Sequence, residues 1–145
     1  MPKRRVEPLP AEVFAELAAA LPHGIALTNV SPTAEPLELA TAVEQAIVFF
    51  RKQPGSLSDE QIAGLGVLWG KAVSQATGWT WAQLLEGETR LTCLVAQDHA
   101  HVCAPLAFVR EQLEATTPCT ALVLFNIIRE GNLPPAKMEE LVFAG

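Results

Sequence analysis

SDEQIAGLGVLWGKAVSQATGWTW, residues 58–81, contains all three tryptophans of the chain and its clearest structural signals. Ser58 followed three residues later by Gln61 forms a capping box, which marks the start of a helix. Apolar residues then recur at helical spacing along one face, at Ile62, Leu65, Trp69, Val73 and Ala76. The pattern predicts a helix with a buried apolar face that stops at Gly78, where a strand containing Trp79 and Trp81 begins.

Three glycines interrupt this predicted helix, at Gly64, Gly66 and Gly70. Each glycine in a helix interior costs about 1 kcal/mol relative to alanine, because it lacks a side chain and gains more backbone freedom in the unfolded chain. Their concentration in two turns indicates that another backbone packs very close to the helix here. Together with Trp69, Trp79 and Trp81, we expect Gly66 and Gly70 to belong to the structural core.

Further helices are predicted on both sides of this stretch. The first opens at Pro10, carries an apolar stripe that includes Leu17, and is expected to end at Pro22. Residues 23–35 then read as an extended connection, with a short edge strand as an alternative. Residues 36–52 form a second amphipathic helix, and Pro105 opens another. A last helix is expected to start at residues 117–118. Its following residues, 121–128, are apolar on nearly every face. A buried helix is favoured there over a central strand.

A change of hydrophobic period after Gly78 predicts the sheet. Residues 79–81 begin one strand, residues 89–96 form a second, and residues 100–104 form a short third. Residues 86–88 supply the first hairpin turn. The expected fold is α+β, with four to five helices packed on a small three-stranded antiparallel β-meander. Residues 1–9 are expected to be a flexible basic tail, and residues 10–145 a single domain.

Composition narrows the classes of function. Half of the residues are hydrophobic and only 18% are charged, so we expect part of the apolar surface to be covered by a protein partner or by a second copy, as in a homodimer. Three of the ten basic residues lie within residues 3–5, which leaves seven basic against sixteen acidic residues in the remainder. Such a body repels phosphate backbones, so no nucleic-acid partner is expected.

Neither a membrane partner nor secretion is expected from the sequence. The longest apolar run, residues 121–128, is far too short to span a bilayer, and Glu7 and Pro8 interrupt any signal-peptide pattern after the basic start. Cys93, Cys103 and Cys119 are an odd set without a close pair, which suits a reducing compartment. The sequence therefore predicts a cytoplasmic protein.

One polar cluster has the residue types of a metal site. His99, His101 and Cys103 alternate along a predicted strand, so they would share one face, and imidazole and thiolate are suitable zinc ligands. A second group of ligands at the usual spacing is absent from the sequence, and His99 falls close to a turn. Histidines that face solvent at the end of a strand are the favoured interpretation. No cofactor is expected.

Other catalytic patterns are weaker still. Cys119 follows Thr117 and Pro118 and would lie in the first turn of a helix, where a thiol pKa is lowered, but a small buried core residue is the favoured interpretation. Paired carboxylates at residues 86 and 88 and at 139 and 140 fall in exposed contexts. The chain has no Gly-x-Ser-x-Gly, P-loop, dinucleotide or His-Glu-x-x-His pattern.

Four features together resemble a family of small, uncharacterised bacterial α+β domains. They are the LGVLWG helix of residues 65–70 (LGxxWG in the family), the GWTW strand start of residues 78–81 (GWxW), a strand that ends near Asp98, and the helix opened by Pro105. The resemblance covers residues 58–134. It implies a bacterial fold and no known reaction, and it brings no catalytic residues to this chain.

The sequence therefore favours a non-enzymatic protein-interaction or accessory domain. The chain is rich in apolar residues that would pack in a core, and its titratable residues do not form a motif that would bring them together in one site. The alternative is a small metal-binding protein or an enzyme that uses His99, His101 and Cys103.

Overall fold

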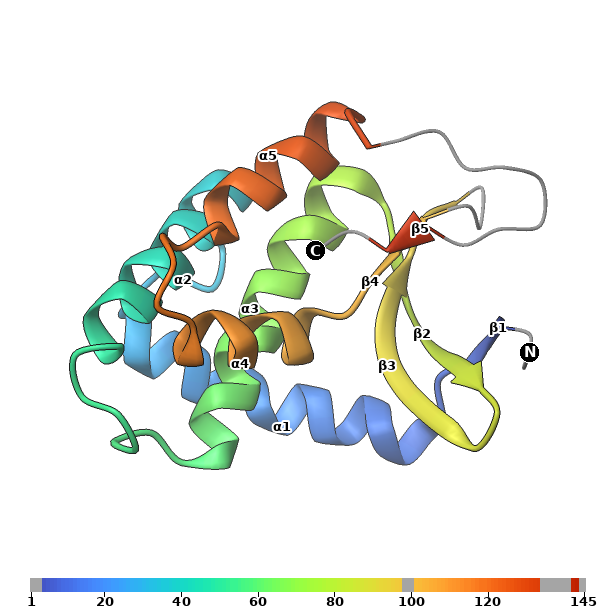
Figure 1. Ribbon diagram of the computed structural model, residues 1–145, viewed down its shortest axis with the longest axis horizontal. Helices are drawn as coiled ribbons and strands as arrows, with labels where there is room; N and C mark the ends of the chain where they lie inside the picture. Colours follow the sequence, from blue (N-terminus) through green and yellow to red (C-terminus); the bar gives the residue numbers. More distant parts are fainter. Residues whose placement is uncertain (1–3, 98–100, 134–141, 144–145) are drawn as a thin grey trace.

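Helix α3 (Asp59–Thr77) lies at the centre of the fold in the computed structural model, which describes residues 4–97, 101–133 and 142–143 (Figure 1). Its start is the predicted capping box: the Ser58 hydroxyl accepts from the Gln61 backbone N–H at 3.1 Å, and the Gln61 side chain accepts from the Ser58 N–H at 2.8 Å. Its end is the predicted glycine, since Gly78 has φ +81°. Both ends of α3 are thus set by local sequence.

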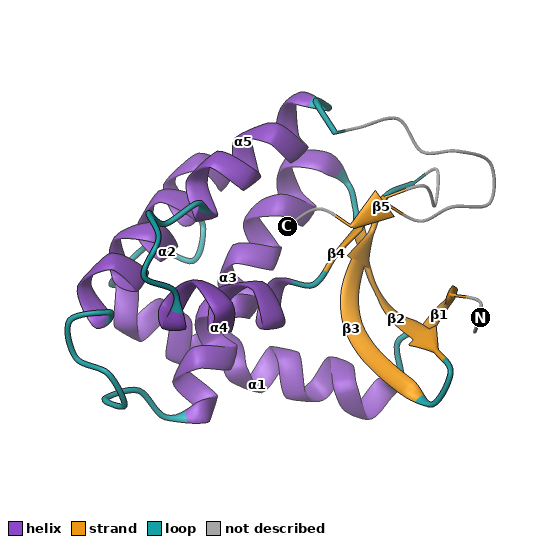
Figure 2. Cartoon of the chain, viewed as in Figure 1, coloured by secondary structure: helices purple, strands orange, loops and turns teal. Residues whose placement is uncertain are grey.

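Four further helices in the described part of the chain contact α3. They are α1 (Ala11–Thr28), α2 (Pro36–Phe50), α4 (Pro105–Glu114) and α5 (Ala121–Glu130). Figure 2 shows the helices gathered to one side of the strands. No helix among the described residues has both the length and the apolarity that a membrane-spanning segment needs.

The strands form one sheet in the order β1-β2-β3-β4-β5. They are β1 (Arg4–Pro8), β2 (Thr80–Glu86), β3 (Thr89–Val95), β4 (His101–Cys103) and β5 (Val142–Phe143). The first four are antiparallel neighbours, and β5 is parallel to β4. The α+β class is confirmed. The predicted three-stranded meander corresponds to β2, β3 and β4, and the described sheet is larger by the two outer strands.

We expected a flexible tail over residues 1–9, but residues 4–8 form strand β1, while residues 1–3 lie outside the described residues. Residues 4–8 pair with β2 in a register that runs from Arg4 opposite Glu86 to Pro8 opposite Ala82. Val6 packs against an apolar cluster of the sheet, in which Leu84 is buried. The pairing joins segments about eighty residues apart in the sequence, so no short-range sequence pattern could predict it.

The prediction that the first helix ends at Pro22 is wrong. The helix continues for six residues beyond Pro22 and stops at Asn29, which has φ +54°. A proline inside a helix costs about 3 kcal/mol because it removes one hydrogen bond and crowds the preceding turn. The continued part of α1 packs on α3, and Gly24 lies directly against the Gly64 carbonyl. We attribute the tolerance of Pro22 to this contact.

The glycines of α3 meet close neighbours, as expected. A methyl group on Gly64 would lie 2.5 Å from the Gly24 nitrogen, and one on Gly66 would lie 2.8 Å from the Leu106 Cα at the start of α4. At Gly70 the neighbour is a side chain, the Trp81 indole, whose Cη2 would be 2.5 Å away. The prediction of a close backbone is therefore confirmed at two positions and corrected to a side chain at the third.

Trp69 is fully buried and joins α3 to α5. Its indole N–H donates to the Ala121 carbonyl at 3.0 Å, and its ring lies 4.9 Å from the Phe108 ring, centroid to centroid. Trp79 is buried in the same cluster, and Trp81 packs against it while half-buried. Residues 121–128 are helical, so the favoured interpretation holds over the strand, but α5 begins at Ala121 rather than at residues 117–118.

Candidate functional site

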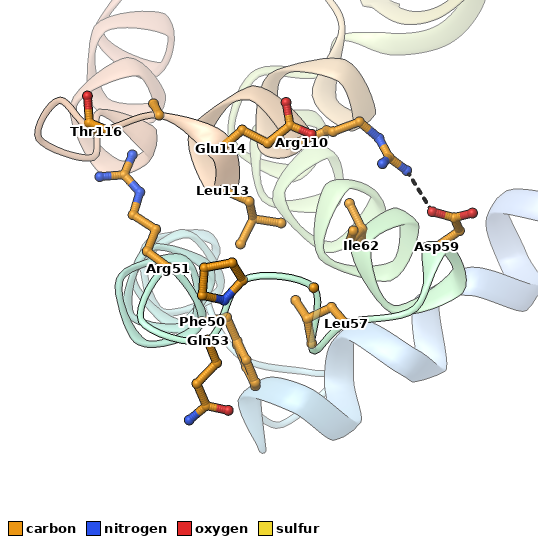
Figure 3. A pocket seen from close by; sticks show the side chains of 13 residues that line it. Phe50, Arg51, Gln53, Leu57, Asp59, Ile62, Arg110, Leu113, Glu114 and Thr116 are labelled. Atoms are coloured by element: carbon orange, nitrogen blue, oxygen red, sulfur yellow. Dashed lines mark hydrogen bonds and ion pairs between the residues drawn. The ribbon is translucent and has the colours of Figure 1, made fainter.

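A cleft of about 600 Å³ opens where α2 ends, α3 begins and α4 ends; we call it the α2–α4 cleft (Figure 3). It falls within the range of volumes typical of ligand sites. Its lining comes from three helix ends and from the connections that follow α2 and α4. It comprises Phe50, Arg51, Gln53, Pro54, Gly55, Leu57, Asp59, Ile62, Arg110, Leu113, Glu114, Ala115 and Thr116.

The floor of the cleft is apolar. Phe50 comes from the last turn of α2, Leu57 from the following connection, Ile62 from the first turns of α3 and Leu113 from the end of α4. Phe50, Leu57 and Leu113 also pack against the main core, so the floor is continuous with it. Figure 3 shows these side chains gathered around the central space. An apolar group of a ligand would contact this floor.

Arg51 holds one side of the cleft in place. Its Nε donates to the Gln112 carbonyl and its Nη1 to the Thr117 carbonyl, each at 2.6 Å, and its Nη2 donates to the Gln112 side-chain oxygen at 3.4 Å. All three acceptors are neutral oxygens. A guanidinium group carries five N–H donors, so Arg51 retains capacity for an anionic partner beyond these bonds.

An ion pair stands at the other side of the cleft. Arg110 Nη2 lies 3.3 Å from Asp59 Oδ1, and the two side chains are 48% and 88% exposed. An ion pair this exposed contributes little to stability. Its place on the rim instead offers one cation and one anion to a ligand that approaches the apolar floor.

Two side chains cap the start of α5 next to the cleft. The Glu44 carboxylate of α2 accepts from the Leu122 N–H at 3.2 Å, and the Gln112 side chain of α4 accepts from the Thr120 N–H at 3.0 Å. The first N–H groups of a helix have no partner within it, and a carboxylate there also interacts favourably with the helix dipole. These hydrogen bonds connect α2 and α4 to the start of α5 beside the cleft.

Two of the three predicted metal ligands lie among the described residues. His101 and Cys103 lie in β4 two residues apart, as predicted, while His99 lies outside the described residues. Cys103 is fully buried in the main core, and burial raises the pKa of its thiol well above the ordinary value, with the Cys93 charge adding to the rise. No group of three metal-ligating side chains occurs among the described residues. Metal binding stays a prediction, against which the burial of Cys103 argues.

Cys119 lies in the connection before α5, not in its first turn. Burial raises the pKa of its thiol, a hydrogen bond from the Ala121 backbone opposes that rise, and the nearby Glu44 carboxylate adds to it. Burial also raises the pKa of Cys93, to about 11. The surroundings of all three thiols therefore favour the protonated, unreactive form.

The cleft residues had no distinctive signal in the sequence. Phe50 fits the apolar stripe of α2, and Arg51 fits a helix C-terminus, where a cation interacts well with the dipole. The Arg51 contacts span 61 and 66 residues of sequence, so they depend on how α2 and α4 are packed. Only a search for cations at helix ends next to apolar residues could have marked Arg51.

Comparison with known proteins supports the fold and names no activity. No protein-family model matches the sequence, and no curated protein matches it. The structure is similar to a crystal structure, at 1.50 Å resolution, of a protein from Bacteroides thetaiotaomicron VPI-5482, with a TM-score of 0.65 and 12% sequence identity. The match covers 86% of this chain and 47% of that one, so the chain spans about half the length of its neighbour. At this identity the likeness shows a shared fold alone, and the resemblance to small bacterial α+β domains stays a prediction.

Proposed function

We propose that this protein is a non-enzymatic interaction domain that binds a segment of a partner protein in the α2–α4 cleft. The observation that carries the proposal is the combination in one cleft of an apolar floor with Arg51, whose three hydrogen bonds all go to neutral oxygens. The expected segment presents an apolar side chain next to a carboxylate. The apolar side chain would contact Leu57 and Leu113, and the carboxylate would bind the guanidinium group.

The chemistry of the thiols supports recognition over catalysis. A nucleophilic cysteine needs a lowered pKa, whereas Cys93, Cys103 and Cys119 all have raised pKa values. The three cysteines are free, which suits the reducing cytoplasm and supports a cytoplasmic location as part of the proposal.

Selection from a displayed library of random peptides, each about a dozen residues long, tests the proposal. We expect the enriched peptides to share an apolar residue beside Asp or Glu. Their affinity, measured by fluorescence polarisation, should fall at least about tenfold when the carboxylate is changed to its amide, because the charge-assisted bond to Arg51 is lost.

Two neighbouring substitutions provide the matched control. Thr116 lines the cleft and Thr117 does not, and both side chains are exposed. Thr116→Trp should occlude the cleft and abolish peptide binding, whereas Thr117→Trp should leave it intact. Equal binding by both variants, or a selection that yields no consensus, would reject the cleft as the binding site.

A further inference from the structure

Strand β1 is the outermost strand of the described sheet and has β2 as its single strand neighbour there. A strand at the edge of a sheet presents a row of main-chain donors and acceptors to whatever approaches it, and a second extended strand satisfies them most completely. The side chains on β1 indicate which strand would fit. Arg5 and Glu7 point to one face of the sheet and Val6 to the other, because successive residues of a strand alternate.

The charges on β1 are self-complementary in a single register. If a second copy pairs antiparallel through a two-fold axis perpendicular to the sheet at Val6, then Arg5 of each copy lies opposite Glu7 of the other. Moving the axis to Arg5 places two arginines opposite each other, and moving it to Glu7 places two glutamates opposite each other. Opposite charges directly across a strand pair stabilise it, and like charges destabilise it. The sequence of β1 thus allows one symmetric register and opposes the two adjacent ones.

The surroundings of β1 fit the same arrangement. Arg5 and Glu7 already form an ion pair within the strand, with Nε and Oε1 3.1 Å apart, and their side chains remain 69% and 41% exposed. Both are therefore accessible to a second copy. Val6 packs against the apolar cluster that contains Leu84 and Val95. Placing Val6 of a second copy beside it would extend that cluster across the new boundary between the sheets.

We propose that the protein self-associates through β1, edge to edge, to form a continuous sheet across a two-fold axis at Val6. The pairing is isologous, since the same five residues contribute from each copy. Five residues per copy form a small contact, and Pro8 at the end of the strand lacks an N–H to donate, so the dimer is weak and depends on concentration. This surface is separate from the α2–α4 cleft, and the inference does not depend on the function proposed there.

Sedimentation velocity of the full chain between about 10 μM and 1 mM tests the inference. The wild-type protein should show a reversible rise toward the dimer, and the rise should weaken at high salt because the cross-strand pairs are exposed. The single variants Arg5→Glu and Glu7→Arg should each remain monomeric over the same range, since each places like charges across the axis.

Mixing the two variants separates the proposed register from general damage. In a one-to-one mixture, each copy that carries only acidic side chains at these two positions meets a copy that carries only basic ones, so a dimer should form that neither variant forms alone. Circular dichroism of each variant checks that it is folded. Wild-type protein that stays monomeric at about 1 mM, dimers in both single variants, or a mixture that stays monomeric would each overturn the inference.

Discussion

Helix α3 and its neighbours meet in two contrasting ways at different places in the molecule. At the crossing of α1 and α3, side chains are missing from both helices, and Gly24 and Gly64 bring the two backbones into contact. At the junction where α2 ends, α3 begins and α4 ends, the helices leave a cleft of about 600 Å³, and the polar side chains of Arg51, Glu44 and Gln112 connect α2, α4 and the start of α5 beside it.

Because the two regions are built differently, they are sensitive to different kinds of substitution. A crossing built from glycine tolerates no added atom, because interiors are packed as densely as organic crystals and a backbone cannot move aside as a side chain can. A junction built from hydrogen bonds tolerates changes of size but depends on each donor and acceptor. The first region is suited to support, and the second leaves room for a ligand.

The largest effect is expected for Gly64→Ala. The new methyl group would lie 2.5 Å from the Gly24 nitrogen and 2.6 Å from the Ala20 carbonyl oxygen, and both neighbours are backbone atoms. We expect a loss of about 3 kcal/mol in the free energy of unfolding, measured by urea denaturation, even though alanine favours the helix by about 1 kcal/mol.

Gly70→Ala is the matched control in the same helix. Its new methyl group meets the far edge of the half-buried Trp81 indole, which can shift, so the loss should stay below about 1 kcal/mol. Equal losses for the two variants would contradict the distinction between backbone and side-chain neighbours.

A smaller effect is expected for Arg51→Met at the junction. The substitution keeps most of the aliphatic length of the side chain but removes three hydrogen bonds, two to Gln112 of α4 and one to Thr117 in the connection between α4 and α5. The free energy of unfolding should fall by about 2 kcal/mol, because the donor is charged and the site is half-buried. Lys52→Met removes the neighbouring, exposed positive charge and should change stability by less than about 0.5 kcal/mol.

Thiol alkylation compares the solvent accessibility of a cysteine beside the junction with that of cysteines in packed clusters. Cys119 lies half-buried beside the junction, whereas Cys93 and Cys103 are fully buried in packed clusters. Iodoacetamide should therefore label Cys119 first in the folded protein, and the other two only after unfolding. Because burial raises the pKa of Cys119 above its ordinary value, its labelling should still be increasing with pH between pH 7 and pH 9. Mass spectrometry of the peptides measures the order, and early labelling of Cys103 would contradict it.

The smallest effect is expected from metal removal at the end of the sheet. Because Cys103 is fully buried in the main core, His99 and His101 would have to bind zinc without it. Untagged protein should contain less than about a tenth of an equivalent of zinc, and a chelator should leave its melting temperature unchanged. Stoichiometric zinc that is lost in His101→Ala would establish the metal site after all.

Short-range signals account for the parts of the fold that were predicted. The capping box at Ser58, the stop at Gly78 and the start of α4 at Pro105 each depend on residues within one helical turn. The hairpin between β2 and β3 depends on the turn at Gly87, which has φ +62°. Such features form wherever the local sequence favours them, so they can be recognised without knowing what packs against them.

The cleft could not be predicted by the same means. Its lining is gathered from residues 50–62 and residues 110–116, and no pattern in either segment indicates that they meet. The exposed apolar side chains of α2 and α5 could not be predicted either. Val48, Phe49 and Val123 are each about half exposed although they are apolar. Composition indicated surplus apolar surface, but not its place.

By itself, the sequence determined the α+β class, most of the helices, the central hairpin and the close approach of neighbours to the glycines of α3, because those features follow from periodicity, capping and the absence of side chains. Only the tertiary structure decided that α1 runs on through Pro22, that residues 4–8 join the sheet, and that Arg51 reaches α4. The physical reason is the same in each case: the favourable contacts come from segments far away in the chain, and they outweigh the local preferences of proline, of a charged terminus and of a helix end.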